Sequence, residues 1–292
     1  MFSSADSLGA RSNSEIATYL QSIGDSDGAK DFLNGDVAGQ GMFGPPRAYK
    51  ATGMVLGFIE PPANDEKTLP IVGVSQIVGD KGLVDKRIKI TMDRFYVHEY
   101  PGSGQHDILC EFSGKNQVAG ETEELRLALR FKARDGAAAS LSGSPIFLGV
   151  TVGRDGIAFD GRSVNLGSKN DEQVLSTFES PAFQSGLSLL TSAQPALKPL
   201  VGLAASVVKS VATKSQNCQV HDFKLGLDFE SGGTSARLRI GSYIVVQTDE
   251  DAWDWDHYAW NRDAMSLHDK ATNANLKGSN YMVFSVARFS DV

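Results

Sequence analysis

The sequence predicts a mainly β protein: an antiparallel two-sheet sandwich of about ten strands, with a short N-terminal helix and one helical insertion. Short apolar runs alternate with polar residues at a period of two, and turn residues such as Gly, Asp and Pro separate these runs. Most of the runs have no helical pattern between them, which favours packed antiparallel sheets over a parallel α/β sheet. The 292 residues, 41% of them hydrophobic, are enough to bury a large core.

The first 47 residues are expected to form a helix and a glycine-rich arm. Ser12 and Glu15 have the spacing of a capping box, and apolar residues follow them at helical spacing. Over 25–46 the composition shifts to Gly, Asp, Ala and Pro, which predicts a loop. The predicted organisation is therefore an N-terminal helix and arm over 1–47 and a β-sandwich domain over 48–292.

The strand pattern is clearest over 125–131, where Leu, Leu, Leu and Phe alternate with Arg, Ala and Arg. The runs 71–78 and 88–92 flank a Gly-Asp-Lys-Gly turn and are expected to form a hairpin. The run 146–152 is apolar in both phases, as in a central strand, and Arg154-Asp155-Gly156 is expected to turn it into a further hairpin. Phe95 and Val97 continue the 88–92 strand in a shifted phase. Other strands are expected over 50–59, 108–112, 157–159, 164–166, 223–229, 238–246 and 281–287.

One helical insertion is expected over about 181–214. Six apolar residues within it fall on one face of a helix: Leu200, Val201, Ala204, Val207, Val208 and Val211. Its amphipathic character also permits a membrane-active role for the 183–214 segment. Interfacial helices have bulkier apolar faces, so packing onto the sandwich or a neighbouring subunit is the favoured interpretation.

The composition limits which partners and which cellular location are expected. A net charge of −7 with a pI near 5.3 disfavours nucleic acid, which needs clustered Lys and Arg. Two cysteines are too few for a disulfide framework, so a reducing, cytoplasmic location is expected. Residues 1–13 lack the pattern of a secretory signal, and no window has the ~20 apolar residues of a membrane span. The chain is therefore expected to be soluble, with membrane association disfavoured.

Signatures of catalysis are weak in this chain. Gly39-Gln-Gly41-Met-Phe-Gly44 matches a dinucleotide-binding pattern, but no strand is expected before it and two prolines follow it. A flexible glycine loop explains it better. The chain contains neither a G-x-x-x-x-G-K nor a G-x-S-x-G sequence. We therefore expect that the protein is not an enzyme.

The cysteines and histidines do not form a recognisable site in the sequence. Cys218 and His221 have C-x-x-H spacing, yet no second pair of zinc ligands follows nearby. We interpret Cys218 as a small buried hydrophobic residue or as a loop thiol at the start of the strand that contains Phe223. Cys110 is in phase with Ile108 and Phe112 and is expected to face the core. His98 and His106 flank the loop at residue 101 and are interpreted as surface histidines.

The strongest candidate site is the acidic and aromatic loop over 249–260. It contains all three tryptophans of the chain and five carboxylates. Indole rings are frequent interface anchors, whereas crowded carboxylates favour a cation or a basic partner. Calcium, which prefers oxygen ligands, is the one cofactor that the loop suggests. The candidate partner-binding residues are Trp253, Trp255, Tyr258 and Trp260, and the candidate metal ligands are Asp249, Asp251, Asp254 and Asp256.

The loop and the predicted sandwich together resemble the Ca²⁺-binding C2 domains, in which a β sandwich carries aspartates, often as D-x-D, on loops at one end. Asp254-Trp-Asp256, after the strand predicted over 243–246, is similar to that pattern. The resemblance covers this tripeptide and the fold class, and it implies calcium binding by these aspartates. The chain departs from the family over 101–107, where Asp107 is the one acidic residue and the first acidic loop is not recognisable.

Three functional hypotheses follow from these patterns. The favoured one is a non-catalytic binding or assembly module that contacts a protein partner or a neighbouring subunit through the acidic, Trp-rich loop. The alternative is a membrane-associating or pore-forming protein, with or without calcium, that uses the 183–214 segment. A hydrolase that uses the loop carboxylates comes third, because adjacency in a loop does not separate two pKa values as acid and base work requires.

Overall fold

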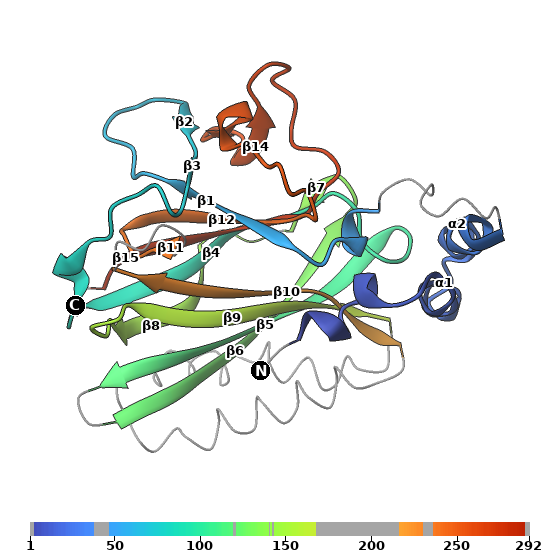
Figure 1. The fold of residues 1–292 in the computed structure, drawn as a ribbon, viewed down its shortest axis with the longest axis horizontal. Helices are drawn as coiled ribbons and strands as arrows, with labels where there is room; N and C mark the ends of the chain where they lie inside the picture. Colours follow the sequence, from blue (N-terminus) through green and yellow to red (C-terminus); the bar gives the residue numbers. More distant parts are fainter. Residues whose placement is uncertain are drawn as a thin grey trace.

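The computed structural model describes residues 3–37, 47–118, 121–139, 141, 143–167, 216–229 and 236–289. The helical insertion expected over 181–214 and the glycine stretch over 39–44 lie outside these residues. The predicted mainly β fold is confirmed, although the described strands form three sheets where two were expected. Figure 1 shows the sheets as stacked layers, with the two helices at one end of the stack.

Sheet A, the middle layer, has seven strands. Its order is β3 (Val72–Gly73), β1 (Met54–Ile59), β12 (Gly241–Gln247), β15 (Tyr281–Arg288), β4 (Arg87–Val97) and β7 (Ala137–Ala138), and β8 (Ser144–Thr151) also pairs with β4.

Sheet C lies against one face of sheet A. Its order is β11 (Ala236–Arg237), β10 (Asn217–Asp228), β9 (Ile157–Leu166), β5 (Gln105–Val118) and β6 (Glu121–Arg134). The pairing is antiparallel except for the two-residue contact of β11 with β10. Sheet B lies on the other face of sheet A and contains β14 (Ser266–Asp269), β13 (Tyr258–Asn261) and β2 (Thr68–Pro70).

The main core fills the space between sheets A and C. Phe284 of β15 lies at its centre, 5.9 Å, 5.7 Å and 5.3 Å between ring centroids from Phe112, Phe159 and Phe223 of sheet C. All four rings are buried, and most of the contacts are edge-on or tilted, as aromatic pairs prefer. These two sheets therefore form the sandwich that the alternating pattern predicts.

A second core, the cap core, lies between sheets A and B. Trp260 and Leu267 of sheet B pack there against residues of β12, β15 and β4 that point away from the main core. Tyr96 and Tyr281 stack within it, with ring centroids 5.0 Å apart. Sheet A is thus buried on both faces where sheet B covers it. The sequence does not reveal the third sheet because its strands are three or four residues long.

A β-bulge explains the change of phase that the sequence shows within β4. Met92 pairs with Phe284 and Arg94 pairs with Val283, so Asp93 is the extra residue between them. Met92 and Phe95 therefore both point into the main core although they are three positions apart, while Tyr96 points into the cap core.

Two expected hairpins are not formed. The turn over 79–82 is expected to join two paired strands, but β3 pairs with β1, and β4 pairs with β15, β7 and β8. The turn contains the 3₁₀ helix η4 (Lys81–Leu83), whose start Asp80 caps. The turn over 154–156 likewise leads from β8 in sheet A to β9 in sheet C, so it crosses between the layers. Among the described strands β8 pairs with β4 alone, so it is not the central strand that its apolar sequence suggested.

The N-terminal residues form more helix than expected. The predicted helix is α1 (Asn13–Ser22), and its capping box between Ser12 and Glu15 is present. The structure contains a second helix, α2 (Ser26–Val37), in the stretch interpreted as a loop. Asp25 accepts a hydrogen bond from the amide of Gly28 at its start, and the apolar side chains of Ala29 and Phe32 are buried. Burial of this face outweighs the poor helix propensity of the glycines.

The N-terminal residues are also part of the main core. Leu8, Ile16 and Leu20 are fully buried within it. Leu8 belongs to η2 (Leu8–Ala10), which together with η1 (Ser4–Asp6) packs along β10. These residues explain why β10 is buried on both faces near its start.

Candidate binding site

The acidic and aromatic loop leads from the end of β12 to β13 and lies against the edge of sheet A. It contains the 3₁₀ helix η7 (Trp255–His257). Asp254 begins this helix, and its Oδ1 accepts a hydrogen bond from the amide of Asp256 at 2.8 Å. The Asp254 side chain thus satisfies a free amide at the start of η7 and stabilises the tight turn between Trp253 and Tyr258.

Three of the four predicted partner-binding residues come together in an aromatic cluster, Trp253, Trp255 and Tyr258. Trp253 stacks on Tyr258 with ring centroids 4.7 Å apart and an angle of 15° between planes. Trp255 meets Trp253 edge-on at 5.4 Å. All three rings are half-buried against the cap core. Trp260 is different, since it is only 7% exposed and belongs to the cap core itself.

Trp255 attaches the cluster to strand β1. Its indole Nε1 donates a hydrogen bond to the carbonyl of Leu56 at 3.1 Å. Its ring lies over Gly57, where a Cβ atom would come within 2.8 Å of the indole. Trp253 has no such attachment, because its Nε1 is shielded from solvent without a hydrogen-bond acceptor among the described residues.

The four candidate metal ligands do not converge. The Oδ1 of Asp249 accepts hydrogen bonds from the amides of Thr52 (2.9 Å) and Gly53 (2.6 Å), and Asp254 caps η7. Asp251 and Asp256 are exposed. In the described part of the chain no three Asp, Glu, His or Cys side chains are placed to hold one metal ion. Calcium binding therefore stays a prediction without a gathered ligand set.

Beneath the loop, His221 is buried and structural. Its Nε2 lies 3.2 Å from the carbonyl oxygen of Gly53, the residue whose amide Asp249 binds. Burial lowers the pKa of His221 to about 4, with opposing contributions from Gly53 and Asp249. The ring is thus neutral near pH 7 and connects strand β10 to the start of β1.

Both cysteines are buried and unpaired, as expected. Burial raises the pKa of Cys218 to about 11 and raises that of Cys110 further. The two thiols are therefore protonated near neutral pH, which makes them poor nucleophiles and poor metal ligands.

His106 is not the surface residue that the sequence suggested. It is buried, with Nε2 2.8 Å from Oδ1 of Asp135, and Asp135 also accepts a hydrogen bond from the amide of Tyr100. The partner is 29 residues away and becomes adjacent through the β5–β6 hairpin, so no local pattern could have indicated it. His98, in the same loop, lies half-buried, and its backbone amide donates to Asn280.

A polar groove of about 420 Å³ opens beside the loop. Its lining carries both signs of charge, from Arg47, Lys50, Asp249 and Glu250. Most of these groups already have partners: Arg47 pairs with Glu99 and Asp31, and Lys50 donates to Asn13. The other lining residues are Gly9, Ala10, Ala48, Ala51, Thr52, Gln247, Thr248, Gly278 and Ser279.

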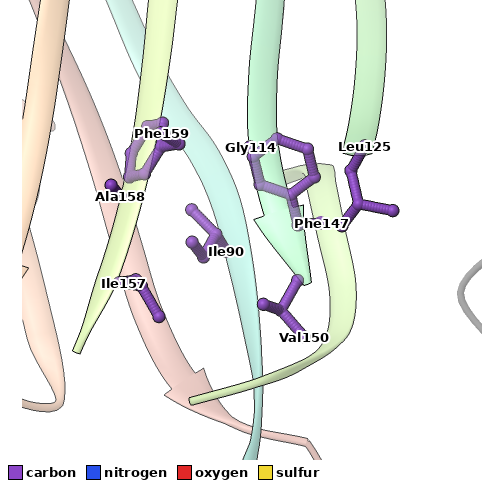
Figure 2. A pocket seen from close by; sticks show the side chains of 8 residues that line it. All are labelled: Ile90, Gly114, Leu125, Phe147, Val150, Ile157, Ala158 and Phe159. Carbon is purple, nitrogen blue, oxygen red and sulfur yellow. The ribbon is translucent and has the colours of Figure 1, made fainter. Parts of the chain in front are cut away.

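A second hollow lies inside the main core and is apolar. Figure 2 shows its lining side chains, which come from both sheets of the sandwich. Its free volume of about 10 Å³ is close to the least that one water molecule needs, and its walls offer few polar groups. It is therefore a packing gap. The lining residues are Ile90, Gly114, Leu125, Phe147, Val150, Ile157, Ala158 and Phe159.

Comparison with known proteins found no match to any protein-family model, to any curated protein or to any solved structure. In the described residues no helix combines the length and the apolar character needed to cross a membrane. The aromatic cluster with its surrounding carboxylates is therefore assessed on its geometry alone.

Proposed function

We propose that this chain is a non-catalytic binding or assembly module that contacts a protein partner or a neighbouring subunit through its acidic, Trp-rich loop. The observation that carries the proposal is the half-exposed aromatic cluster, Trp253, Trp255 and Tyr258, with exposed carboxylates around it. Tryptophan and tyrosine are the residues most enriched among energetically dominant interface contacts.

The position of the cluster favours binding. The cap core supports it from below, and the Trp255 indole donates a hydrogen bond to the Leu56 carbonyl. Rings that are already ordered lose little conformational entropy when a partner covers them. The exposed carboxylates of Asp251, Asp254 and Asp256 would lie at the rim, where charge selects a partner and speeds its approach.

Two of the described histidines and both cysteines have structural environments. His221 is buried and bound to a backbone carbonyl, His106 is buried and bound to Asp135, and both thiols lie within the main core. These environments give binding more support than catalysis.

The proposal is tested by solution mass and by affinity capture. Light scattering over a range of concentrations, with and without Ca²⁺, measures self-association, and tagged protein measures capture of a partner. Trp253→Ala should weaken whichever association is found by tenfold or more, since losing a central aromatic anchor costs about 2 kcal/mol. Val78→Ala is the matched control, because it removes a large apolar side chain that is 74% exposed and lies outside the loop. A monomer that captures nothing, or equal association of both variants, contradicts the proposal.

A further inference from the structure

We infer that the open edge of strand β1 beside Trp255 accepts an extended, basic segment of the partner protein as an added strand. The inference rests on the proposed function and specifies the chemistry of the partner. It depends on three features of the described residues: the pairing of β1, the hydrogen bond of Trp255 and the distribution of charge along this edge.

The first feature is that the start of β1 has a neighbour on one side only. Strand β12 pairs with all six residues of β1, whereas β3 pairs with Gly57 and Phe58 alone. In an antiparallel pair, the N–H and C=O of one residue point the same way and successive residues alternate. The Leu56 carbonyl meets Trp255 and so points away from β12. The backbone groups of Met54 and Leu56 therefore face outward, and no strand among the described residues pairs with them.

The second feature is that Trp255 occupies this edge with a replaceable contact. Its indole supplies one hydrogen bond, to the Leu56 carbonyl, where a neighbouring strand would supply a backbone amide. An arriving strand that takes over this carbonyl keeps the number of hydrogen bonds to it unchanged. In this position of the loop the Trp253 N–H is also shielded without an acceptor in the described part of the chain, which destabilises the arrangement. The backbone hydrogen bond of an added strand thus replaces the one that the indole gives up, and the displaced rings can pack against the side chains of that strand.

The third feature is negative charge at both ends of the edge. Asp249 lies at its start, bound to the amides of Thr52 and Gly53. Asp254 and Asp256 flank Trp255 at the other end and are exposed. Two basic side chains stand near these carboxylates: Lys50 lines the same groove as Asp249 and donates to Asn13, and the His257 ring lies 3.7 Å from Asp254. A segment with Lys or Arg at alternate positions would place its charges beside these carboxylates and its backbone beside Met54 and Leu56.

The tryptophans themselves report on this edge. All three of the chain lie between residues 253 and 260, so intrinsic fluorescence monitors the loop without a label. The probes are an eight-residue peptide that alternates Val and Lys, one that alternates Val and Glu, and the Lys peptide with alternate backbone amides methylated. The Lys peptide should shift the emission saturably and the Glu peptide should not. Methylation should weaken binding about tenfold, as expected for two lost backbone hydrogen bonds.

Two Trp→Phe substitutions test whether the Trp255 hydrogen bond competes with an added strand for the Leu56 carbonyl. Trp255→Phe keeps an aromatic ring but frees this carbonyl, so the variant should bind the Lys peptide several-fold more tightly. Trp253→Phe is the matched control, since the Trp253 N–H has no acceptor to lose, and it should bind as the wild type does. Urea unfolding of both variants checks that the fold is retained.

The outcomes separate the inference from the proposed function. Equal binding of the methylated and unmethylated Lys peptides would show attraction by charge alone and would overturn strand addition. Absence of binding by every peptide would also overturn it. In either case the proposed function stands if Trp253→Ala still weakens association in solution, and it fails separately if Trp253→Ala has no effect there.

Discussion

Gln247 and Asn280 hydrogen-bond to each other through both backbone and side chain. The Gln247 amide donates to the Asn280 carbonyl at 2.9 Å, and Asn280 Nδ2 donates to Gln247 Oε1 at 3.0 Å. Asn280 Oδ1 also accepts the amides of His98 and Glu99, and Gln247 Nε2 donates to the Ala51 carbonyl. This buried pair joins the end of β12 and the start of β15 to the residues that follow β4 and to those that precede β1. Strand β1 is the one that Trp255 contacts.

Asn280→Ala should therefore lower the free energy of unfolding by about 2–3 kcal/mol. It removes the acceptor of the part-buried amides of His98 and Glu99 and the donor to the buried Oε1 of Gln247, and unsatisfied buried groups are costly. Urea unfolding followed by circular dichroism measures the change. Asn64→Ala, at an exposed site, should stay within about 0.5 kcal/mol of the wild type, and an equal loss in the two variants would refute the buried role.

His221 should make stability depend on pH between about 4 and 6.5. Its folded-state pKa is lowered to about 4, so above 6.5 the ring is neutral in both states and its contribution is fully present. As the pH falls below 6.5 the unfolded chain takes up the proton first, and stability is lost progressively until the folded pKa is reached. The total is on the order of 3 kcal/mol.

His221→Gln should flatten the slope of unfolding free energy against pH in this window. His257→Gln should leave the slope as it is, because the His257 side chain is 71% exposed. Urea titrations at several pH values measure both slopes. Identical slopes in the wild type and His221→Gln would mean that the ring is accessible to protons in the folded state.

Gly57→Ala should displace Trp255. The new Cβ would lie 2.8 Å from the indole and 2.7 Å from Cγ2 of Ile71, too close for either contact. We expect a loss of about 1–3 kcal/mol and a shift of tryptophan emission towards that of exposed indole. Gly226→Ala in β10, where a Cβ meets no atom within 4 Å, should change neither quantity. An unshifted emission in Gly57→Ala would mean that the indole does not rest on this glycine.

The two thiols should resist labelling until the chain unfolds. Cys110 and Cys218 are buried, and burial raises the pKa of each thiol. A thiol-specific chromogenic reagent at pH 8 should therefore react slowly with native protein and rapidly with two thiols per chain in urea. Fast labelling of the native protein, located to Cys218 by mass spectrometry, would show that the N-terminal segment over β10 opens readily.

Local patterns predicted the parts of the fold that depend on local chemistry. The capping box at Ser12, the alternation within β6 and the change of phase within β4 all correspond to observed structure. Strand pairing depends on packing between distant segments, and the turn sequences predicted two pairings wrongly. The turn before β4 and the one after β8 resemble hairpin turns but connect strands that do not pair.

The candidate site shows the same division. The composition of the loop identified an aromatic cluster, but not that Trp260 belongs to a core, because the core exists only once β2 and β13 pair. The attachment of Trp255 to Leu56 joins residues 199 positions apart and has no signature in the sequence. The buried state of His106 likewise depends on a distant carboxylate.

Strand β12 sends alternate residues to opposite sides of sheet A: Tyr243 and Val245 enter the main core, and Ile244 and Val246 enter the cap core. Adjacent positions in the sequence thus belong to different packing environments. A substitution at Val245 therefore acts first on the interior of the sandwich, and one at Val246 acts first on the cap core beneath the aromatic cluster. The loop could therefore diverge, or be redesigned for a new partner, on a sandwich whose interior stays the same.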